Sequence, residues 1–515
     1  MTTSTFAANF FWFLLSINWL AEGRWADKWQ RFRQSSLLQA FMILCGVHLL
    51  WLVGSSNMHY ALHDLQVKLP LLASPLVTLT TSALSQRERH WVLWPYVATV
   101  VVVSLIGLVR WFSIADLPYR QIVPFISHIR FSLNVCLVIA IGVAWLQQSK
   151  SSQRRLWHSV VAVAVLLWLL AFLLLIHSYT ALVILLIIFM ADRLRDIIRS
   201  RTLRGRVSHS VLLLTVIAII VLSLYRYVSQ YYTMTPLETK PLPTFTAGGH
   251  RYSHDNGGPI ENGGHINNYI CQEELRSTWS QRSTLPFDTL TRSGHPVYPT
   301  LVRYLGSRGL TKDSVGVMQL TQADIDAIER GTANVVYTQP DILRRMVYQL
   351  LFEYENYKAY GSVNNSSMGE RLLLWQNGWQ VFCQHPLTGV GTGDVADVCH
   401  QRLTDTHSQL AGTTKHLHNQ YLSMLVAFGL VGVAIVAAFF VRAWHRRRHP
   451  MAWLAVVYIL IVLLSMMAED TLETLAGILF CTFPIVLLRS AEDTTQPSSA
   501  GDATVPNSHH PYTSI

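Results

Sequence analysis

Apolar runs close to twenty residues long recur along this chain of 515 residues. A helix that crosses the hydrocarbon core of a bilayer needs about 20 mostly apolar residues, because it rises about 1.5 Å per residue through roughly 30 Å of lipid. Only 14% of the residues are charged and 51% are hydrophobic, whereas about a quarter of the residues of a soluble protein are charged. The sequence therefore predicts an all-α, polytopic membrane protein.

Eleven ranges fit membrane spans, giving about 11 transmembrane helices. They are residues 6–21, 36–54, 70–84, 91–109, 131–147, 159–176, 179–192, 210–228, 419–441, 451–468 and 473–489. The sixth and seventh form one apolar stretch, residues 160–191, which is longer than a single span requires. We expect a hairpin there, broken near the sequence HSYT at residues 177–180.

Basic residues in the short connections set the orientation of the bundle. Basic connections, such as the one from Arg193 to Arg206, alternate with connections that carry few cations, namely Lys68, Arg110, Arg120 and Arg130. Because basic loops stay in the cytoplasm, the N-terminus is predicted outside and the C-terminus inside. This distribution accounts for much of the net charge of +10 without a nucleic-acid partner.

Four parts follow from the spans. Residues 1–228 form an N-terminal bundle of about eight helices, and residues 419–489 contribute about three more. Residues 229–418 have the composition of a soluble protein and form a large, mainly helical domain outside the cytoplasm. Residues 490–515 are polar and rich in Ser, Thr and Pro, so they are predicted to be a disordered cytoplasmic tail.

The outer segment offers two further sets of reactive side chains. Cys383 and Cys399 are its closest pair of cysteines, and the sequence leaves open whether they form a disulfide. Histidines and carboxylates gather near its start, but their spacing matches no standard zinc pattern. We therefore predict no metal from this set, which comprises His250, His254, His265, Asp255 and Glu261.

Candidate binding residues lie late in the outer segment. Arg371 and Trp375 are four residues apart on a predicted helix, so they share a face that could hold a phosphorylated sugar. Gly391 belongs to a glycine-rich loop whose backbone could approach an anion. His418 and Asn419 stand at the first turn of a span, where the helix end favours anions. The alternatives are a solvated arginine, a plain loop and interfacial polar residues.

The order of these residues resembles the O-antigen ligase/polymerase superfamily. The similar series runs from Arg371 and Trp375 through PLTGVG (386–391) and HNQYL (418–422) to GLVG (429–432). The stretches NWLAEGRWADKW and MMAEDTLETLAGILF are similar to one branch of it. The resemblance implies a GT-C-like glycosyltransferase in the bacterial inner membrane, with its large loop in the periplasm. Its donor would be a glycan linked to a polyprenyl diphosphate such as undecaprenyl diphosphate, used with inversion and without a metal or cofactor.

The resemblance also implies roles for residues. His418 matches the family histidine proposed to deprotonate the acceptor hydroxyl, and Arg371 matches an arginine proposed to hold the donor diphosphate. Many members carry another arginine in the outer turn where this chain has HSYT, and we expect Arg130 to supply that charge. Trp375, Gly391 and Asn419 are expected to line the substrate site.

Three functions remain open at this stage. The first is an O-antigen ligase of lipopolysaccharide biosynthesis, which moves the glycan onto lipid A-core or another acceptor. The second is an O-antigen or exopolysaccharide polymerase that joins lipid-linked repeat units. The third, of a different class, is a transporter or a sugar-binding sensor. A transporter predicts internal repeats and charges in mid-span, and the sequence shows neither clearly.

Overall fold

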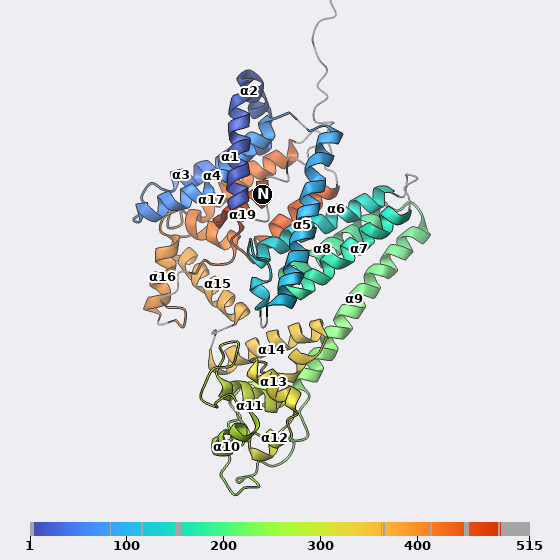
Figure 1. Ribbon diagram of the computed structural model, residues 1–515. Coiled ribbons are helices and arrows are strands. Elements are labelled where there is room, and N and C mark those ends of the chain that lie inside the picture. Colours follow the sequence, from blue (N-terminus) through green and yellow to red (C-terminus); the bar gives the residue numbers. More distant parts are fainter. Residues whose placement is uncertain are drawn as a thin grey trace, which may run out of the picture.

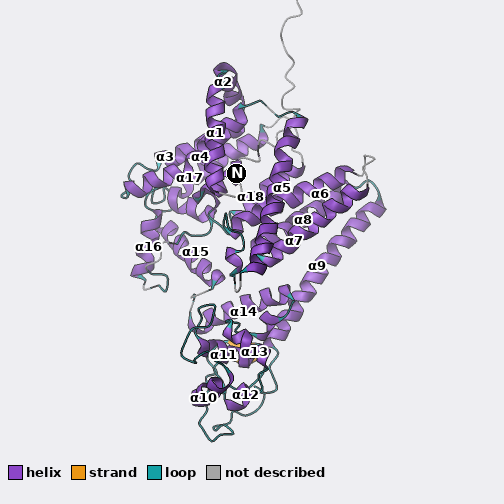
Figure 2. Ribbon diagram, viewed as in Figure 1, coloured by secondary structure: helices purple, strands orange, loops and turns teal. Residues whose placement is uncertain are grey.

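Helices dominate the computed structural model (Figure 2). It describes residues 5–82, 84–114, 117–149, 156–361, 363, 366–406, 408–411, 415–446, 453–482 and 485. Within these residues there are nineteen α-helices and one two-stranded antiparallel sheet, formed by β1 (Ile260–Glu261) and β2 (Gly264–His265). The predicted tail, residues 490–515, lies outside the described residues.

Each predicted span overlaps a helix. The helices are α1 (Thr5–Ala21), α3 (Ser36–Leu50), α4 (Met58–Thr80), α5 (Gln86–Ser113), α6 (His128–Ser149), α7 (Leu156–Leu175), α8 (Tyr179–Arg199), α9 (Leu203–Tyr232), α17 (Gln420–His445), α18 (Trp453–Ser465) and α19 (Leu475–Thr482). An additional helix, α2 (Trp25–Gln34), connects α1 and α3. Five helices, α5, α6, α7, α9 and α17, are long and apolar enough to cross a membrane. The all-α membrane class is thus supported, while the number eleven stays a prediction.

The expected hairpin in the long apolar stretch is present. Helix α7 ends at Leu175 and α8 begins at Tyr179. Between them His177 has a φ of 50°, a left-handed conformation that an α-helix cannot continue through. The break therefore falls within HSYT, and it divides a stretch too long for one span into two helices that both pack against α6.

The prediction for the third span was wrong at its start. Helix α4 begins at Met58, not near residue 70, because Asn57 caps it by accepting a hydrogen bond from the Tyr60 N–H at 3.0 Å. Lys68 therefore lies inside a helix and is buried, whereas the charge pattern had placed it in an outer connection. Its partner Asp64, one turn earlier, makes this helical turn too polar for a hydropathy window to include.

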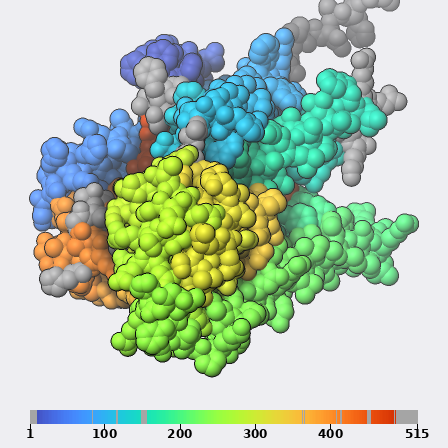
Figure 3. Space-filling view, turned by 60° about the horizontal axis from the view of Figure 1, so that its bottom comes forward, coloured from blue at the N-terminus to red at the C-terminus, as the bar shows by residue number. Residues whose placement is uncertain are grey.

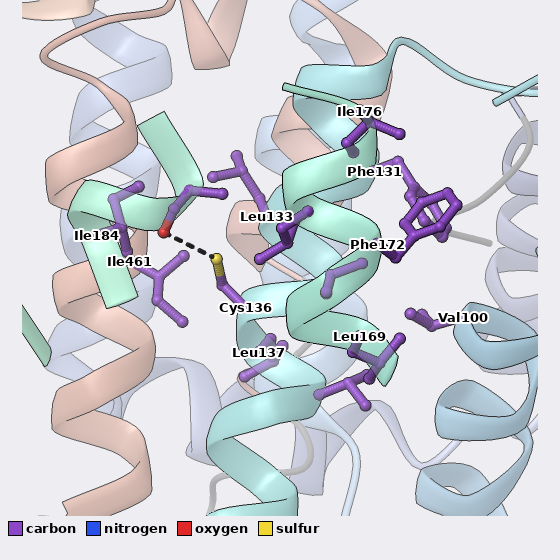
Figure 4. Packing of buried hydrophobic residues seen from close by; sticks show 14 of the residues in the cluster. Val100, Phe131, Leu133, Cys136, Leu137, Leu169, Phe172, Ile176, Ile184 and Ile461 are labelled. Carbon is purple, nitrogen blue, oxygen red and sulfur yellow. Dashed lines mark hydrogen bonds between the residues drawn. The ribbon is translucent and has the colours of Figure 1, made fainter. Parts of the chain in front are cut away.

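Two groups of membrane helices lie side by side in Figure 1. One packs α5, α6, α7, α8 and α18 around buried residues such as Phe131, Phe172 and Ile461 (Figure 4). In this core the Cys136 thiol donates to the Ala181 carbonyl at 3.6 Å, as the dashed line in Figure 4 marks. The other group packs α3, α4, α17 and α19 around residues such as Phe428 and Leu472.

The outer segment is mainly helical, as expected. Its first part contains α10 (Gln272–Arg282), α11 (Val297–Ser307), α12 (Ser314–Met318), α13 (Gln322–Glu329) and α14 (Ile342–Tyr360). They surround a core that includes Trp279, Leu301 and Ile328. Helix α9 runs from the membrane bundle down to this part (Figure 1), which forms the front of the molecule in Figure 3.

Two more helices join the outer segment to α17. They are α15 (Ser367–Gln384) and α16 (Val395–Asp405), and their apolar faces pack with α17 around Leu374, Val381 and Val426. Short 3₁₀ turns occur at η1 (Tyr119–Gln121), η2 (Val335–Thr338) and η3 (Thr471–Glu473). Cys383 is exposed and Cys399 is buried, and both are free thiols.

The predicted outer connections all contact the outer segment. Hydrogen bonds join Ser56 N–H to Asp394 Oδ2 (2.8 Å), Arg120 Nη2 to Ser367 Oγ (3.2 Å), Tyr179 Oη to Gln349 Oε1 (3.3 Å) and Arg371 Nη2 to Glu469 Oε1 (2.7 Å). These four connections therefore lie at the same end of the helices. That placement agrees with the alternation of basic and poorly basic loops.

Candidate functional site

His418 and Asn419 form the entrance to α17. Asn419 is its N-cap, and the side-chain oxygen accepts from the Leu422 N–H at 3.1 Å. His418 has a φ of 51°, a conformation that costs a non-glycine residue on the order of 1–2 kcal/mol. A strained backbone at such a position requires surrounding contacts that hold it.

Asp470 supplies those contacts. Its Oδ2 accepts the backbone N–H of His418 at 2.5 Å, and its Oδ1 accepts that of Asn419 at 3.2 Å. The Ser423 hydroxyl donates to Oδ1 at 2.8 Å. The carboxylate therefore satisfies donors at the start of α17, where the helix itself offers no acceptors, and fixes the backbone that carries His418.

Glu469 joins the two principal predicted residues. Its Oε1 accepts from Arg371 Nη2 at 2.7 Å, and its Oε2 lies 3.8 Å from His418 Nδ1. Burial raises the pKa of this carboxyl, but His418, Arg371 and Arg130 oppose burial and bring the pKa below its ordinary value of 4.5. Glu469 is therefore an ionised group that faces one guanidinium and one imidazole.

Arg130 reaches the same turn from α6. It donates from Nη2 to the Asp470 carbonyl at 3.3 Å and from Nη1 to the Thr471 carbonyl at 3.4 Å. Gly477 leaves room for it, because a Cβ there would collide with Arg130 Nη1 and the Thr471 carbonyl oxygen. The fold thus brings Arg130, Arg371 and His418 to one short turn, although they are far apart in sequence.

Gly391 is placed differently. Its N–H donates to the Ala427 carbonyl at 3.0 Å, so it is already engaged by α17. Gly429 interrupts α17 with a φ of 62°, and the freed groups pair with the loop 386–391. The pairs are Val390 N–H to Val426 O (2.9 Å), Leu430 N–H to Pro386 O (2.9 Å) and Val431 N–H to Leu387 O (3.0 Å). The glycine-rich loop therefore completes the kinked helix, and we no longer assign the Gly391 amide to an anion.

Trp375 lies on α15, one turn after Arg371. Its ring is half-buried against the apolar cluster of α15, α16 and α17. Its Nε1 is buried and has no hydrogen-bond partner within the described part of the chain. An unpaired buried donor is uncommon, and this one lies one helical turn from Arg371.

The sequence analysis missed Glu469 and Asp470. Both stand in MMAEDTLETLAGILF, in the turn between the last two predicted spans. Two adjacent carboxylates between apolar ranges were a visible feature, but charges in a connection are common there. Their contacts with Arg371 and His418 join positions about 50–100 residues apart, and no local pattern encodes such a pairing.

A buried triad lies beside this turn. Lys68 Nζ is 2.7 Å from Asp64 Oδ2 and 2.7 Å from Glu473 Oε2. The Gln420 side-chain amide donates to Glu473 Oε1 at 3.1 Å. This buried pairing was not foreseen, since Asp64 and Lys68 had been placed in a connection between two predicted spans.

The triad lines a cavity that holds about 50 Å³ of water-accessible space, enough for a few water molecules. His48, Tyr60 and His416 are among its other lining residues, and His418 is not. The two histidines of HLHN (416–419) therefore lie in different environments: His416 borders this cavity, whereas His418 faces Glu469.

Two members of the histidine and carboxylate set at the start of the outer segment contact other protein groups. His254 Nε2 contacts the Pro243 carbonyl at 2.8 Å, and its Nδ1 accepts from the Tyr269 N–H at 3.1 Å. Glu261 forms an ion pair with Arg303 at 2.8 Å. These side chains are engaged separately.

Part of the chain matches a known protein family. Residues 341–437 match the model of a protein family described as O-antigen ligase. The matched range runs from α14 into α17 and contains Arg371, Trp375, Gly391, His418 and Asn419. No curated protein matches the chain.

Proposed function

We propose that this chain, whose residues 341–437 carry the domain of the O-antigen ligase/polymerase superfamily, is a glycosyltransferase of the bacterial inner membrane. It would move a glycan from a polyprenyl diphosphate to a hydroxyl of lipid A-core or another acceptor. Residues 229–418 would stand in the periplasm. The observation that carries the proposal is the convergence of Arg371 and His418 on Glu469 at the entrance of α17.

His418 would act as the general base. Glu469 lies on the Nδ1 side of the imidazole. This placement favours the tautomer with a proton on Nδ1, so that Nε2 is free to take the proton from the hydroxyl group of the acceptor substrate. The acceptor oxygen would then attack the anomeric carbon from the face opposite the diphosphate. The bond from that carbon to the diphosphate oxygen breaks, and the electron pair leaves with the diphosphate, so the configuration inverts.

Arg371 and Arg130 would stabilise the leaving diphosphate. A guanidinium has five N–H donors, and one donor of Arg371 is engaged by Glu469. The bonds from Arg130 go to backbone carbonyls and are long. Both cations therefore keep capacity for phosphate oxygens, and such charge-assisted bonds are strengthened where water is partly excluded.

The location suits a lipid-borne donor. Helix α17 is long and apolar enough to cross the membrane, so its first turn would lie near the boundary between lipid and water. A diphosphate on a polyprenyl chain meets a water-borne or lipid-borne acceptor at that boundary. No nucleotide is required, because the sugar–diphosphate bond supplies the driving force.

Ligase and polymerase activity share this donor chemistry, and we favour the ligase. A strain that lacks the protein separates them through its glycan profile. Loss of all attached polymer, with long lipid-linked chains accumulating, is expected for a ligase. Attachment of single repeat units would instead identify a polymerase. Unchanged surface glycans with altered export or sensing would favour the transporter or sensor alternatives.

The catalytic proposal is tested with His418→Ala and, as its matched control, His416→Ala. Loss of a general base costs about 10²–10⁴ in rate, so polymer transfer from purified lipid-linked donor should fall by that factor in His418→Ala. His416 borders the other cavity, and its replacement should change the rate only slightly. Melting curves must show both variants folded. Normal turnover by His418→Ala would refute the base assignment.

A further inference from the structure

A tight hairpin meets the start of α10 in the outer segment. In the hairpin, the Thr246 N–H donates to the His250 carbonyl at 2.8 Å, and the Gly249 N–H donates to the Thr246 carbonyl at 3.1 Å. Cys271 is the N-cap of α10, and Glu274 follows three residues later. Gly248 permits the close approach, because a Cβ there would lie 2.6 Å from Glu274 Oε1 and 3.4 Å from His250 Nδ1.

Three potential metal ligands converge at this meeting point. His250, Cys271 and Glu274 each offer one ligand atom, and these atoms all lie within 4.8 Å of one another. His250 Nδ1 is 2.9 Å from Glu274 Oε1. Zinc binds imidazole nitrogen, thiolate sulfur and carboxylate oxygen at about 2.0–2.3 Å in a tetrahedron. The three atoms need only a small rearrangement to surround one ion.

Neighbouring groups hold the carboxylate in position. Glu274 Oε2 accepts from the Ser314 N–H at 3.0 Å and from the Ser314 hydroxyl at 2.6 Å. Its Oε1 faces His250 and also accepts from the Thr246 hydroxyl. Outer partners that orient a ligand in this way are typical of metal sites.

The surroundings also provide access. Cys271 and Glu274 are buried, while the His250 side chain is 51% exposed. The cluster is therefore open to solvent on the histidine side. An ion can enter there, and a water molecule can occupy the fourth coordination position.

We propose that His250, Cys271 and Glu274 form a zinc site that clips the hairpin at residues 245–251 to α10 and so stabilises the outer domain. Binding converts the Cys271 thiol to a zinc-bound thiolate and releases its proton to solvent. The site lies apart from the residues assigned to glycosyl transfer, and the proposal does not depend on that function. It differs from the histidine set considered in the sequence, since only His250 is shared.

The full-length protein, purified without a histidine tag and stripped with a chelator, is titrated with Zn²⁺ alone. We expect one equivalent per chain to survive dialysis and to raise the melting temperature. Co²⁺ in its place should give thiolate-to-metal charge-transfer absorption. Cys271→Ser should abolish that absorption, and His250→Ala should weaken zinc retention at least tenfold. His295→Ala, which changes another exposed histidine of the outer segment, is the matched control.

Several results would overturn the proposal. They are failure to retain zinc, retention that Cys271→Ser and His250→Ala leave unchanged, or equal loss in His295→Ala. Should Cys271→Ser not fold, His250→Ala decides alone, because His250 is exposed and its replacement leaves the bonds between Glu274 and Ser314 in place. Polymer transfer measured on the same samples separates this outcome from failure of the proposed function.

Discussion

Two ionic clusters stand on either side of residues 416–420 and differ in how completely their charges are paired. In the buried triad, Lys68 contacts both Asp64 and Glu473 at 2.7 Å, and its side chain is 7% exposed. In the open cluster, formed by Arg371, Glu469 and His418, the arginine and histidine side chains are 22% and 36% exposed. The triad leaves its cation little capacity for a ligand, whereas the open cluster retains donors that solvent can reach. The fully paired charges of the triad favour a structural role, and the incompletely paired charges of the open cluster favour a binding role.

One turn supplies both clusters. Glu469 belongs to the open cluster, Glu473 belongs to the buried triad, and Asp470 between them holds the backbone of His418. Substitutions a few residues apart can therefore separate catalysis from stability in the same local structure.

The largest effect is expected for Glu469→Gln. The amide keeps the shape but removes the charge that orients His418 and pairs with Arg371. Replacing the orienting carboxylate of a catalytic histidine by its amide can cost about 10⁴ in rate, and we expect a loss of about 10²–10⁴ in polymer transfer. Glu370→Gln, which breaks the more exposed pair with Lys415, is the control. Equal transfer rates in the two variants would show that the open cluster has no special role in polymer transfer.

Lys68→Ala should act on stability. It leaves Asp64 and Glu473 buried without their cation, and breaking a buried pair in this way costs about 3–5 kcal/mol. Lys415→Ala breaks a more exposed ion pair, which is worth at most about 1 kcal/mol. Thermal unfolding in detergent measures both. A Lys68→Ala protein as stable as wild type, or stable but unable to transfer polymer, would show that the triad is not the structural cluster inferred here.

Arg371→Lys should have a smaller effect on transfer. The substitution keeps the charge but loses the planar fork that binds phosphate oxygens in pairs. We expect a cost of about 1–3 kcal/mol in transition-state stabilisation, measured as the ratio of kcat/KM values. Arg402→Lys changes a partly exposed arginine of α16 that donates to the Gln380 side chain, and it serves as the control. A wild-type rate in Arg371→Lys would show that Arg371 forms only an ordinary ion pair and does not bind the donor diphosphate.

The smallest effect concerns pH. Because the pKa of Glu469 is held below 4.5, the stability gained from its charge is fully present above pH 4.5 and is lost as the pH falls through the lowered value. The difference in melting temperature between wild type and Glu469→Gln should therefore persist from pH 8 to about pH 5. It should be lost only below pH 4.5. Complete loss of the difference between pH 8 and pH 5 would contradict an ionised Glu469.

Much of the fold followed from local patterns, and the exceptions have physical reasons. Apolar runs located helices because burial in lipid requires them, and the length limit of a span located the break at HSYT. The start of α4 was missed because Asp64 and Lys68 neutralise each other inside a helix. A hydropathy average counts both charges as polar and so assigns the segment that carries them to a loop.

The candidate site was predictable only in part. Arg371 and His418 were found through the order of motifs, and their approach to each other was implied by the resemblance alone. The carboxylates that join them required the folded chain. Gly391 was assigned to an anion because a glycine that permits close approach of backbones looks the same whether its partner is a phosphate or, as here, the Ala427 carbonyl.

The kink in α17 has a consequence for how the protein is made. Backbone groups at membrane depth have no water to bond with, so each must find a protein partner. At Gly429 those partners are Pro386 and Leu387, which precede α17 in the chain and belong to the outer segment. Insertion of this helix and folding of the preceding loop are therefore one event. A peptide of α17 alone would lack these partners, and it should straighten in lipid.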